Sequence, residues 1–449
     1  MTLRAVLLGV AAACAVVVAC SQAPPAKQEA PAAEAASYAV GYGPNPVLVA
    51  PQKELAPTLN VAEAIGWTKD GAPTAPAGFT VTRYAEGLDH PRWMLRLPNG
   101  DILVAESSTR PARVQGVQSA VANAMQKRAG ALGPSADRIT LLRDADGDGD
   151  VDTRSVFVQN LNQPFGMALI GDDFYVANTD AVVRFDYAPG AARATGAPTV
   201  VARLPYNAER NGHWTRDVLP SRDGTKLYIT VGSVSNIGEA GAEAENERAA
   251  VWEFDLAAGA HRVFATGLRN PNGLAWEPVT GALWVAVNER DRLGDDLVPD
   301  YMTSVRDGAF YGWPYSYYGQ NVDERVQPQR ADLVAKAVAP DYALGAHTAS
   351  LGLAFVPSDG PLPERFHGGA LVGQHGSWNR SERSGYKVIF VPFTNGRPSG
   401  PPEDFLAGFL NADGKAQGRP VGVAFDRTGA VLVADDVGNV IWRVAPAAP

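Results

Sequence analysis

Residues 422–444 read GVAFDRTGAVLVADDVGNVIWRV, and this stretch decides the fold. Two apolar runs flank a turn that contains Gly429, and a third run, VIWRV, ends the stretch. Glycine tolerates the positive φ angle that hairpin turns need, so the pattern predicts consecutive antiparallel strands. The stretch has three strands and lacks a fourth.

The same sequence pattern occurs five more times upstream. The copies are WMLRLPNGDILVAES (93–107), GMALIGDDFYVANT (166–179), DVLPSRDGTKLYITVGS (217–233), GLAWEPVTGALWVAVNE (273–289) and LGLAFVPSDGPLPERFHGGALVGQH (351–375). Third and fourth apolar runs follow most copies, so each unit predicts a four-stranded antiparallel blade. A spare run, FTVTRY (79–84), precedes the first copy and can complete the last blade. We therefore expect an all-β fold over 79–446, a six-bladed β-propeller closed by its N-terminal strand, which removes exposed sheet edges. The outer strands of the fourth unit must lie within 290–345, so a seventh or irregular blade stays open.

The N-terminal residues predict export. Residues 1–19 have the charge and apolar run of a signal peptide, and residues 17–20, VVAC, resemble a bacterial lipoprotein box with Cys20 as the lipidated residue. Ordinary cleavage near Ala19 is the alternative. Residues 20–50 are rich in Ala, Pro and Glu and predict a flexible linker, and 51–78 lead into the propeller. We expect a periplasm-facing lipoprotein of the outer membrane, attached to the membrane through its lipid alone.

Charge argues against one class of partner. The chain has 39 Lys and Arg against 48 Asp and Glu, a net charge of −9, and no basic block. Nucleic-acid binding is therefore not expected.

The long loops predict where function lies. Connections from a fourth strand to the next blade, and from second to third strands, emerge on one face of a propeller. The longest predicted insertions, near 107–137, 207–216, 233–249, 290–320 and 374–385, are all of these two kinds. We expect the site on that face. There His213, in RNGHWTRD, is a candidate general base, with a loop histidine bound to backbone as an equal alternative.

Several motifs together resemble the quinoprotein sugar dehydrogenases, a family that includes soluble glucose dehydrogenase, aldose sugar dehydrogenases and L-sorbosone dehydrogenase-like proteins. They are NGHW, GLRNPNGLAWEP, DRLGDDLVPD with a later YGWP, and GQHGSWNRS followed by GYKVIFVPF. The resemblance covers residues 79 to 445. It implies a dehydrogenase that oxidises a sugar or sugar-derived aldehyde with pyrroloquinoline quinone (PQQ) and Ca²⁺, and passes electrons to a cytochrome or quinone.

The resemblance also implies roles for individual residues. His213 matches the general base, Arg269 and Asn270 the residues that touch the quinone, and Gln163 a glutamine beside the substrate. A further basic residue should hold a quinone carboxylate, and the candidates are Arg380, Arg383 and, preferred, Arg419. The family binds calcium through backbone carbonyls of a Gly-Pro pair. This chain has Leu293 and Gly294 there, so its metal ligands are uncertain.

A second acidic motif and two rival functions stay open. Residues 144–152, DADGDGDVD, resemble the start of a calcium loop but lack the closing glutamate, since Ser155 stands there. Their place between third and fourth strands puts them on the opposite face, as a solvated turn or a structural calcium site. The rivals are a calcium-dependent hydrolase of the lactonase kind, using Asp89, Asp217 or Glu289, and a non-catalytic binding propeller.

Overall fold

The computed structural model describes residues 38–52, 58–111, 117–209 and 211–447. The signal peptide and Cys20 lie outside these residues, so the lipid anchor stays a prediction. Among the described residues, helices are too short or too polar to cross a membrane.

The first three blades are regular four-stranded antiparallel sheets, each with strands in chain order. The first contains β3 (Pro91–Arg96), β4 (Ile102–Glu106), β5 (Arg138–Arg143) and β6 (Thr153–Val158). The second contains β7 (Met167–Ile170), β8 (Asp173–Ala177), β9 (Ala181–Asp186) and β10 (Thr195–Arg203). The third contains β11 (Val218–Pro220), β12 (Lys226–Val231), β13 (Ala250–Asp255) and β14 (Ala260–Thr266).

The last three blades carry the irregularities. The fourth contains β15 (Asn270–Trp276), β16 (Leu283–Asn288), β17 (Pro299–Ser304) and β20 (Tyr342–Ala346). The fifth contains β21 (Ser350–Phe355), β22 (Ala370–Gln374), β23 (Lys387–Val391) and β26 (Glu403–Leu406), with a small β24–β25 hairpin (Phe393–Thr394, Arg397–Pro398) and a 3₁₀ turn, η1 (Glu364–Phe366). The sixth contains β27 (Pro420–Phe425), β28 (Val431–Asp435) and β29 (Val440–Pro446).

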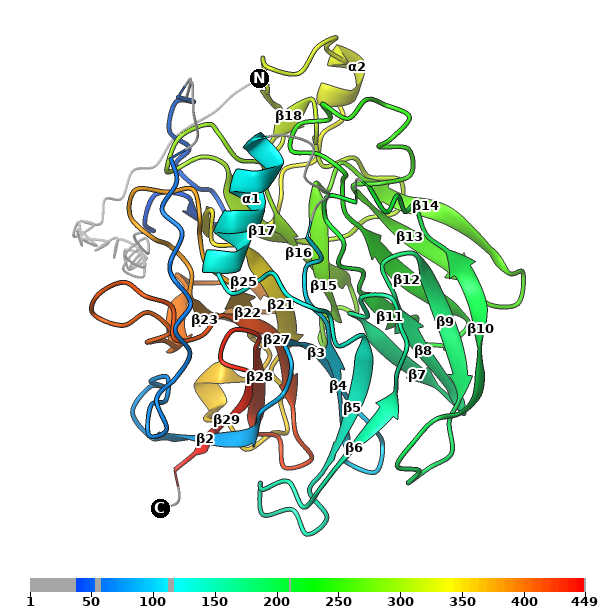
Figure 1. Ribbon diagram of the computed structural model, residues 1–449. Helices are drawn as coiled ribbons and strands as arrows, with labels where there is room; N and C mark the ends of the chain where they lie inside the picture. Colours follow the sequence, from blue (N-terminus) through cyan, green and yellow to red (C-terminus); the bar gives the residue numbers. More distant parts are fainter. Residues whose placement is uncertain (1–37, 53–57, 112–116, 210, 448–449) are drawn as a thin grey trace, which may run out of the picture. The chain divides into compact units, whose positions relative to one another are not determined.

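The ring closes as the sequence predicts. Strand β2 (Phe79–Glu86) pairs antiparallel with β29, from Phe79 opposite Pro446 to Glu86 opposite Val440. Figure 1 shows these first and last strands, in blue and red, side by side. The protein is thus a six-bladed β-propeller in which the N-terminal strand completes the final blade. This closure gives the last sheet its outer strand and leaves no open seam between the ends of the repeat.

The predicted linker ends earlier than residue 50. Tyr42 and Gly43 form β1, which adds a fifth strand to the fourth blade by pairing with β20. The ring of Tyr38 packs edge-on against Tyr342, with centroids 6.4 Å apart. This contact and the pairing of β1 with β20 attach residues 38–43 to the fourth blade, which the alanine-rich composition did not predict.

Buried carboxylates join neighbouring blades at the inner strands. Asp217, ahead of β11, accepts hydrogen bonds from the backbone N–H groups of Val218 and of Leu274 in the next blade. Asp300 in β17 accepts a hydrogen bond from the backbone N–H of Ser350, at the start of the fifth blade. Burial raises the pKa of Asp217 to about 7 and that of Asp300 to about 6. These acids therefore serve the scaffold that positions the loops.

Most long connections share one face. The β4–β5 connection carries helix α1 (Val117–Arg128), and the β12–β13, β16–β17 and β22–β23 connections emerge beside it. One prediction needs correction, because 290–320 is not a single insertion. Strand β17 interrupts it. Residues 305–341 connect β17 to β20 on the opposite face and run alongside β14, where Tyr311 N donates to Thr266 O at 2.9 Å. This excursion holds β18 (Ser316–Tyr317), β19 (Asn321–Val322) and α2 (Ala331–Val334).

Candidate functional site

A cavity of about 820 Å³ lies on the insertion face. Its wall on one side is apolar and comes from the lead-in segment and α1, with Leu59, Val61, Val121 and Met125. The other side is polar or aromatic and comes from four blades, with Glu239, Arg292, His375, Trp378 and Arg419. A pocket of this size with an apolar wall and a few polar groups suits a small organic ligand.

Arg419 is the strongest anion-binding group in this cavity. It is 4% exposed, and one terminal nitrogen donates to the Tyr386 hydroxyl at 2.8 Å while the guanidinium lies 5.0 Å from the Tyr386 ring. Its Nε is buried and has no hydrogen-bond partner in the protein. A buried donor without a partner is costly, so this nitrogen is suited to a ligand oxygen.

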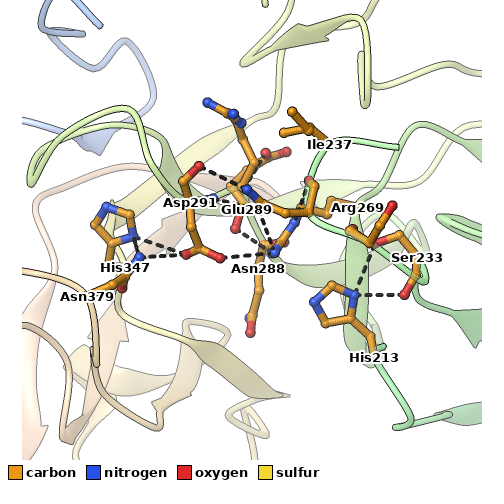
Figure 2. A network of polar contacts seen from close by, with 12 residues as sticks. His213, Ser233, Ile237, Arg269, Asn288, Glu289, Asp291, His347 and Asn379 are labelled. Carbon is orange, nitrogen blue, oxygen red and sulfur yellow. Dashed lines mark hydrogen bonds and ion pairs between the residues drawn. The ribbon is translucent and has the colours of Figure 1, made fainter. Parts of the chain in front are cut away.

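His213 is held in one tautomer. Its Nδ1 lies 2.9 Å from the Ser233 carbonyl oxygen and 3.0 Å from Ser233 Oγ (Figure 2). A carbonyl oxygen only accepts, so Nδ1 carries the proton and Nε2 presents a free lone pair. Burial, and then the nearby Arg269 cation, lower the pKa of His213 to about 3. The ring is therefore neutral at neutral pH, and its Nε2 is unprotonated.

Arg269 lies beside His213 but is already engaged. Its guanidinium donates to the Asn236 carbonyl and side chain, to the carbonyls of Asn288 and Glu289, and to Asp291 (Figure 2). Those contacts use all five N–H groups of the guanidinium. In this arrangement Arg269 positions its surroundings and contributes positive charge, rather than offering a free donor to a ligand.

Asn270 has the free polar atom that Arg269 lacks. Its side chain is 5% exposed, and its Oδ1 is buried with no partner. A Cβ atom at Gly232 would lie 2.5 Å from this oxygen and 2.7 Å from the Cβ of His213. Gly232 thus lies between His213 and Asn270, where a larger residue would clash with both. The structure brings His213, Arg269 and Asn270 together.

Asp291 forms the centre of the adjoining polar network. Its carboxylate contacts Arg269 at 3.2 Å, Asn379 Nδ2 at 2.9 Å and His347 Nδ1 at 3.5 Å (Figure 2). Burial opposes ionisation, but the Arg269 cation outweighs it and holds the pKa of Asp291 well below its usual range. Asp291 opens the motif DRLGDDLVPD, but the sequence analysis assigned it no role.

A second neutral histidine faces the large cavity, and sequence reasoning missed it. His375 Nε2 lies 3.0 Å from both carboxylate oxygens of Asp436, which also binds Arg92. Since a carboxylate only accepts, Nε2 carries the proton and Nδ1 is unprotonated. Burial lowers the pKa of His375 to about 4. The only sequence signal was its place in GQHGSWNRS.

Two predicted residues lie away from this cavity. Gln163 donates from Nε2 to the Ser108 carbonyl and lines a separate 330 Å³ hollow, together with Trp214. Arg380 donates to the Asp295 carbonyl at 2.9 Å and pairs with Asp296 at 2.6 Å. Arg380 therefore ties two loops together, which corresponds to the ordinary loop role rather than to ligand binding.

The predicted metal carbonyls are both occupied. The Leu293 oxygen accepts from Gln52 N at 2.9 Å, and the Gly294 oxygen faces His347 Nε2 at 2.9 Å. As arranged, they do not form a cation site. Among the described residues, one acidic group is close enough to share an ion, namely Asp144, Asp146 and Asp152 on the opposite face. Both Asp144 oxygens there accept backbone N–H groups, as in a self-satisfied turn.

The hydrolase alternative receives little support from its candidate acids. Asp217 uses both oxygens for backbone N–H groups, and Glu289 accepts from the Arg290 N–H at 2.9 Å. Burial raises the pKa of Glu289 to about 7, which disfavours the charged form a cation needs. These residues do not converge on a metal.

The cavity does fit an anionic planar quinone. PQQ carries carboxylates on a flat aromatic ring system. Arg419, whose Nε has no partner, the Trp378 ring and the apolar wall of α1 line the cavity and offer matching contacts for such a molecule. On this face, the described residues contain no group of three His, Cys, Asp or Glu side chains close enough to share an ion.

Comparison with known proteins identifies sequence relatives. The sequence model described as TrAA12-like matches residues 133–307 and 308–447. An uncharacterised Borreliella burgdorferi protein is 29% identical over 247 residues, which is 55% of this chain and 63% of the relative. A pyrroloquinoline quinone-dependent pyranose dehydrogenase from Coprinopsis cinerea is 26% identical over 295 residues, 55% of this chain and 39% of the relative. The chain thus spans less than two thirds of these relatives.

Solved structures share the fold. The holo form of the PQQ domain of the Coprinopsis cinerea pyranose dehydrogenase superposes with a TM-score of 0.66 at 22% identity, covering 84% of this chain and 98% of that one. A calcium structure of a Trichoderma reesei AA12 enzyme gives 0.67 at 18% identity, covering 87% and 99%. At these identities the likeness establishes the six-bladed architecture.

Proposed function

Because this chain belongs to the TrAA12-like family, we propose that it is a quinone-dependent dehydrogenase that oxidises an aldose sugar or a sugar-derived aldehyde. The observation that carries the proposal is that one face holds both the neutral His213 and a cavity lined by Arg419, whose buried Nε has no partner in the protein. A reaction that removes a hydride and a proton from a carbinol needs a proton acceptor and a cofactor pocket, and His213 and this cavity are our candidates for them.

Each residue has a defined task in this proposal. His213 Nε2 accepts the proton of the substrate hydroxyl, and Ser233 keeps the opposite nitrogen protonated. Arg419 and Asn270 hold the cofactor, and Trp378 packs on a flat ring. Arg269 supplies positive charge without leaving its five contacts. When bound, pyrroloquinoline quinone supplies the two-electron acceptor for the hydride.

The surroundings keep His213 unprotonated at neutral pH. The imidazole is neutral because burial and the Arg269 cation disfavour the imidazolium form. The lead-in segment and α1 line one side of the cavity with apolar side chains. A cytochrome or a diffusible quinone is the proposed final electron acceptor, and the lipid anchor at Cys20 remains our proposal for its location.

The test is reconstitution. The purified chain is titrated with PQQ and Ca²⁺, and reduction of an artificial dye is followed with a panel of aldoses and aldehydes. Turnover that requires the quinone supports the proposal. Hydrolysis of lactones without quinone, or sugar binding without turnover, would favour one of the two rival functions.

A further inference from the structure

The loop between β12 and β13 contains a carboxylate that faces inward. Glu245 accepts three hydrogen bonds from one short segment, from Val234 N at 2.8 Å, Ser235 N at 2.9 Å and Ser235 Oγ at 2.5 Å. Both of its oxygens are used, and each contact is to the residues that directly follow Ser233. The carboxylate therefore fixes the backbone just after the residue that holds His213.

Ser233 transmits this constraint to the imidazole. Its N–H donates to the Arg269 carbonyl at 2.8 Å, and its hydroxyl donates to the Ser235 carbonyl at 2.8 Å. Because the hydroxyl proton is used there, Ser233 Oγ can only accept from His213 Nδ1, as the Ser233 carbonyl does. Two acceptors thus face Nδ1, and the Ser235 carbonyl that orients one of them lies in the segment bound by Glu245.

We propose that Glu245 is a positioning residue for His213, which fixes the Nδ1–H tautomer and leaves Nε2 free, acting through Ser235 and Ser233. The inference rests on the proposed role of His213 as the proton acceptor. A carboxylate is required because three donors converge on it. A glutamine could accept with one oxygen only, and its NH₂ group would face a backbone N–H.

The experiment reads the tautomer directly. The full chain is labelled with ¹⁵N-histidine and studied by NMR without cofactor, and His213→Ala assigns the signal among the six histidines. Glu245→Gln is expected to turn a single Nδ1–H signature into a mixture of tautomers. In reconstituted enzyme it should lower kcat about tenfold with KM nearly unchanged, as expected for a proton acceptor that is less often in the right form.

Two further variants control this result. Glu243→Gln makes the same charge change in the same loop, at an exposed side chain that makes no hydrogen bond to residues 233–235, and should change neither readout. Should Glu245→Gln fail to fold, Ser233→Ala tests the same connection to His213, because it removes the Oγ acceptor and keeps the carbonyl acceptor. Because the carbonyl still accepts from Nδ1–H, that tautomer should remain the major form, and the loss of Oγ should add a measurable share of the Nε2–H tautomer.

The outcomes separate the two proposals. A tautomer change in Glu245→Gln together with no sugar oxidation by the wild type would retain the positioning role and overturn the dehydrogenase. An active wild type whose tautomer and kcat are the same in Glu245→Gln and Ser233→Ala would overturn the positioning role alone.

Discussion

The two neutral histidines of the insertion face differ in what holds them. His213 donates hydrogen bonds from Nδ1–H to the carbonyl and the hydroxyl oxygen of Ser233, which lies only 20 residues away in the same blade. His375 donates a hydrogen bond from Nε2–H to the Asp436 carboxylate, which lies 61 residues away in the next blade. The orientation of the His213 ring therefore depends on contacts within one blade, whereas that of the His375 ring depends on the packing of two blades.

The difference also concerns charge. The Arg269 cation stands near His213 and opposes imidazolium formation, whereas the ionised Asp436 would stabilise an imidazolium at His375. Burial holds both rings neutral before reaction. His213 is therefore the stronger candidate for rapid transfer onward of a proton, and His375 is suited to hold a hydrogen-bonded ligand group in the cavity that it lines.

The largest effect that separates the two histidines is expected in turnover. His213→Ala should lower kcat by about a hundred- to ten-thousand-fold, the usual contribution of a general base, with quinone affinity nearly unchanged. Single-turnover kinetics with saturating quinone measure it. The reverse pattern, with the large loss of kcat in His375→Ala, would assign the base to His375.

The next effect concerns the cofactor. Arg419→Ala should weaken quinone binding by roughly ten- to a hundredfold, since it removes a charge-assisted hydrogen bond worth about 1.5–3 kcal/mol. Equilibrium titration followed by protein fluorescence measures this. Arg380→Ala is the matched control, because the Arg380 guanidinium is paired with Asp296. Equal losses in both variants would contradict the placement of the cofactor beside Arg419.

His375→Gln is expected to have a smaller effect of another kind. Loss of one neutral hydrogen bond costs about 1 kcal/mol, or roughly fivefold, and should be seen in KM or quinone affinity rather than in kcat. Steady-state kinetics across quinone concentrations separate these terms. An unchanged KM and affinity would remove His375 from the ligand site.

The acid side of the pH profile gives a further comparison. Because the pKa of His213 is lowered to about 3, kcat/KM should stay level from neutral pH down to about pH 4 and fall only below it. Both histidines have a folded pKa below the unfolded value of about 6.5, so the native state binds fewer protons and stability declines as pH falls below 6.5. Unfolding must be measured over the same range. An acid limb centred near pH 6.5 in folded protein would contradict a buried, neutral His213.

The smallest effect is expected on the opposite face. Asp146→Asn combined with Asp152→Asn should leave turnover unchanged and lower the melting temperature at most, in the presence of Ca²⁺, because a bound ion would stabilise only the native state. A loss of turnover in protein that remains folded and loaded with quinone would contradict the separation of the two faces.

The fold was predictable because its signals are local. Hairpin turns such as the one at Gly429 repeat at similar spacing, and the missing fourth strand of the last unit matched the spare run at Phe79. The resemblance to quinoprotein sugar dehydrogenases is confirmed at the level of the family. The excursion over 305–341 was not predicted, since its path is set by contacts with β14 and not by its own periodicity.

The site was predictable only in part. His213, Arg269 and Asn270 stand in motifs, and the structure does bring them together. It also shows that Arg269 has no free donor and that His375 is oriented by Asp436 and, through it, by Arg92. The contacts of Arg269 come from two blades, and those of His375 through Asp436 and Arg92 span three, so no short motif contains them.

The most direct test of the dehydrogenase assignment is equilibrium binding of PQQ to the purified chain, with and without Ca²⁺, compared in the wild type and in Arg419→Ala. The account predicts one quinone per chain, weakened in the variant, and sugar-dependent bleaching of an electron-accepting dye only in the loaded protein. A wild type that fails to bind the quinone under both conditions would contradict it.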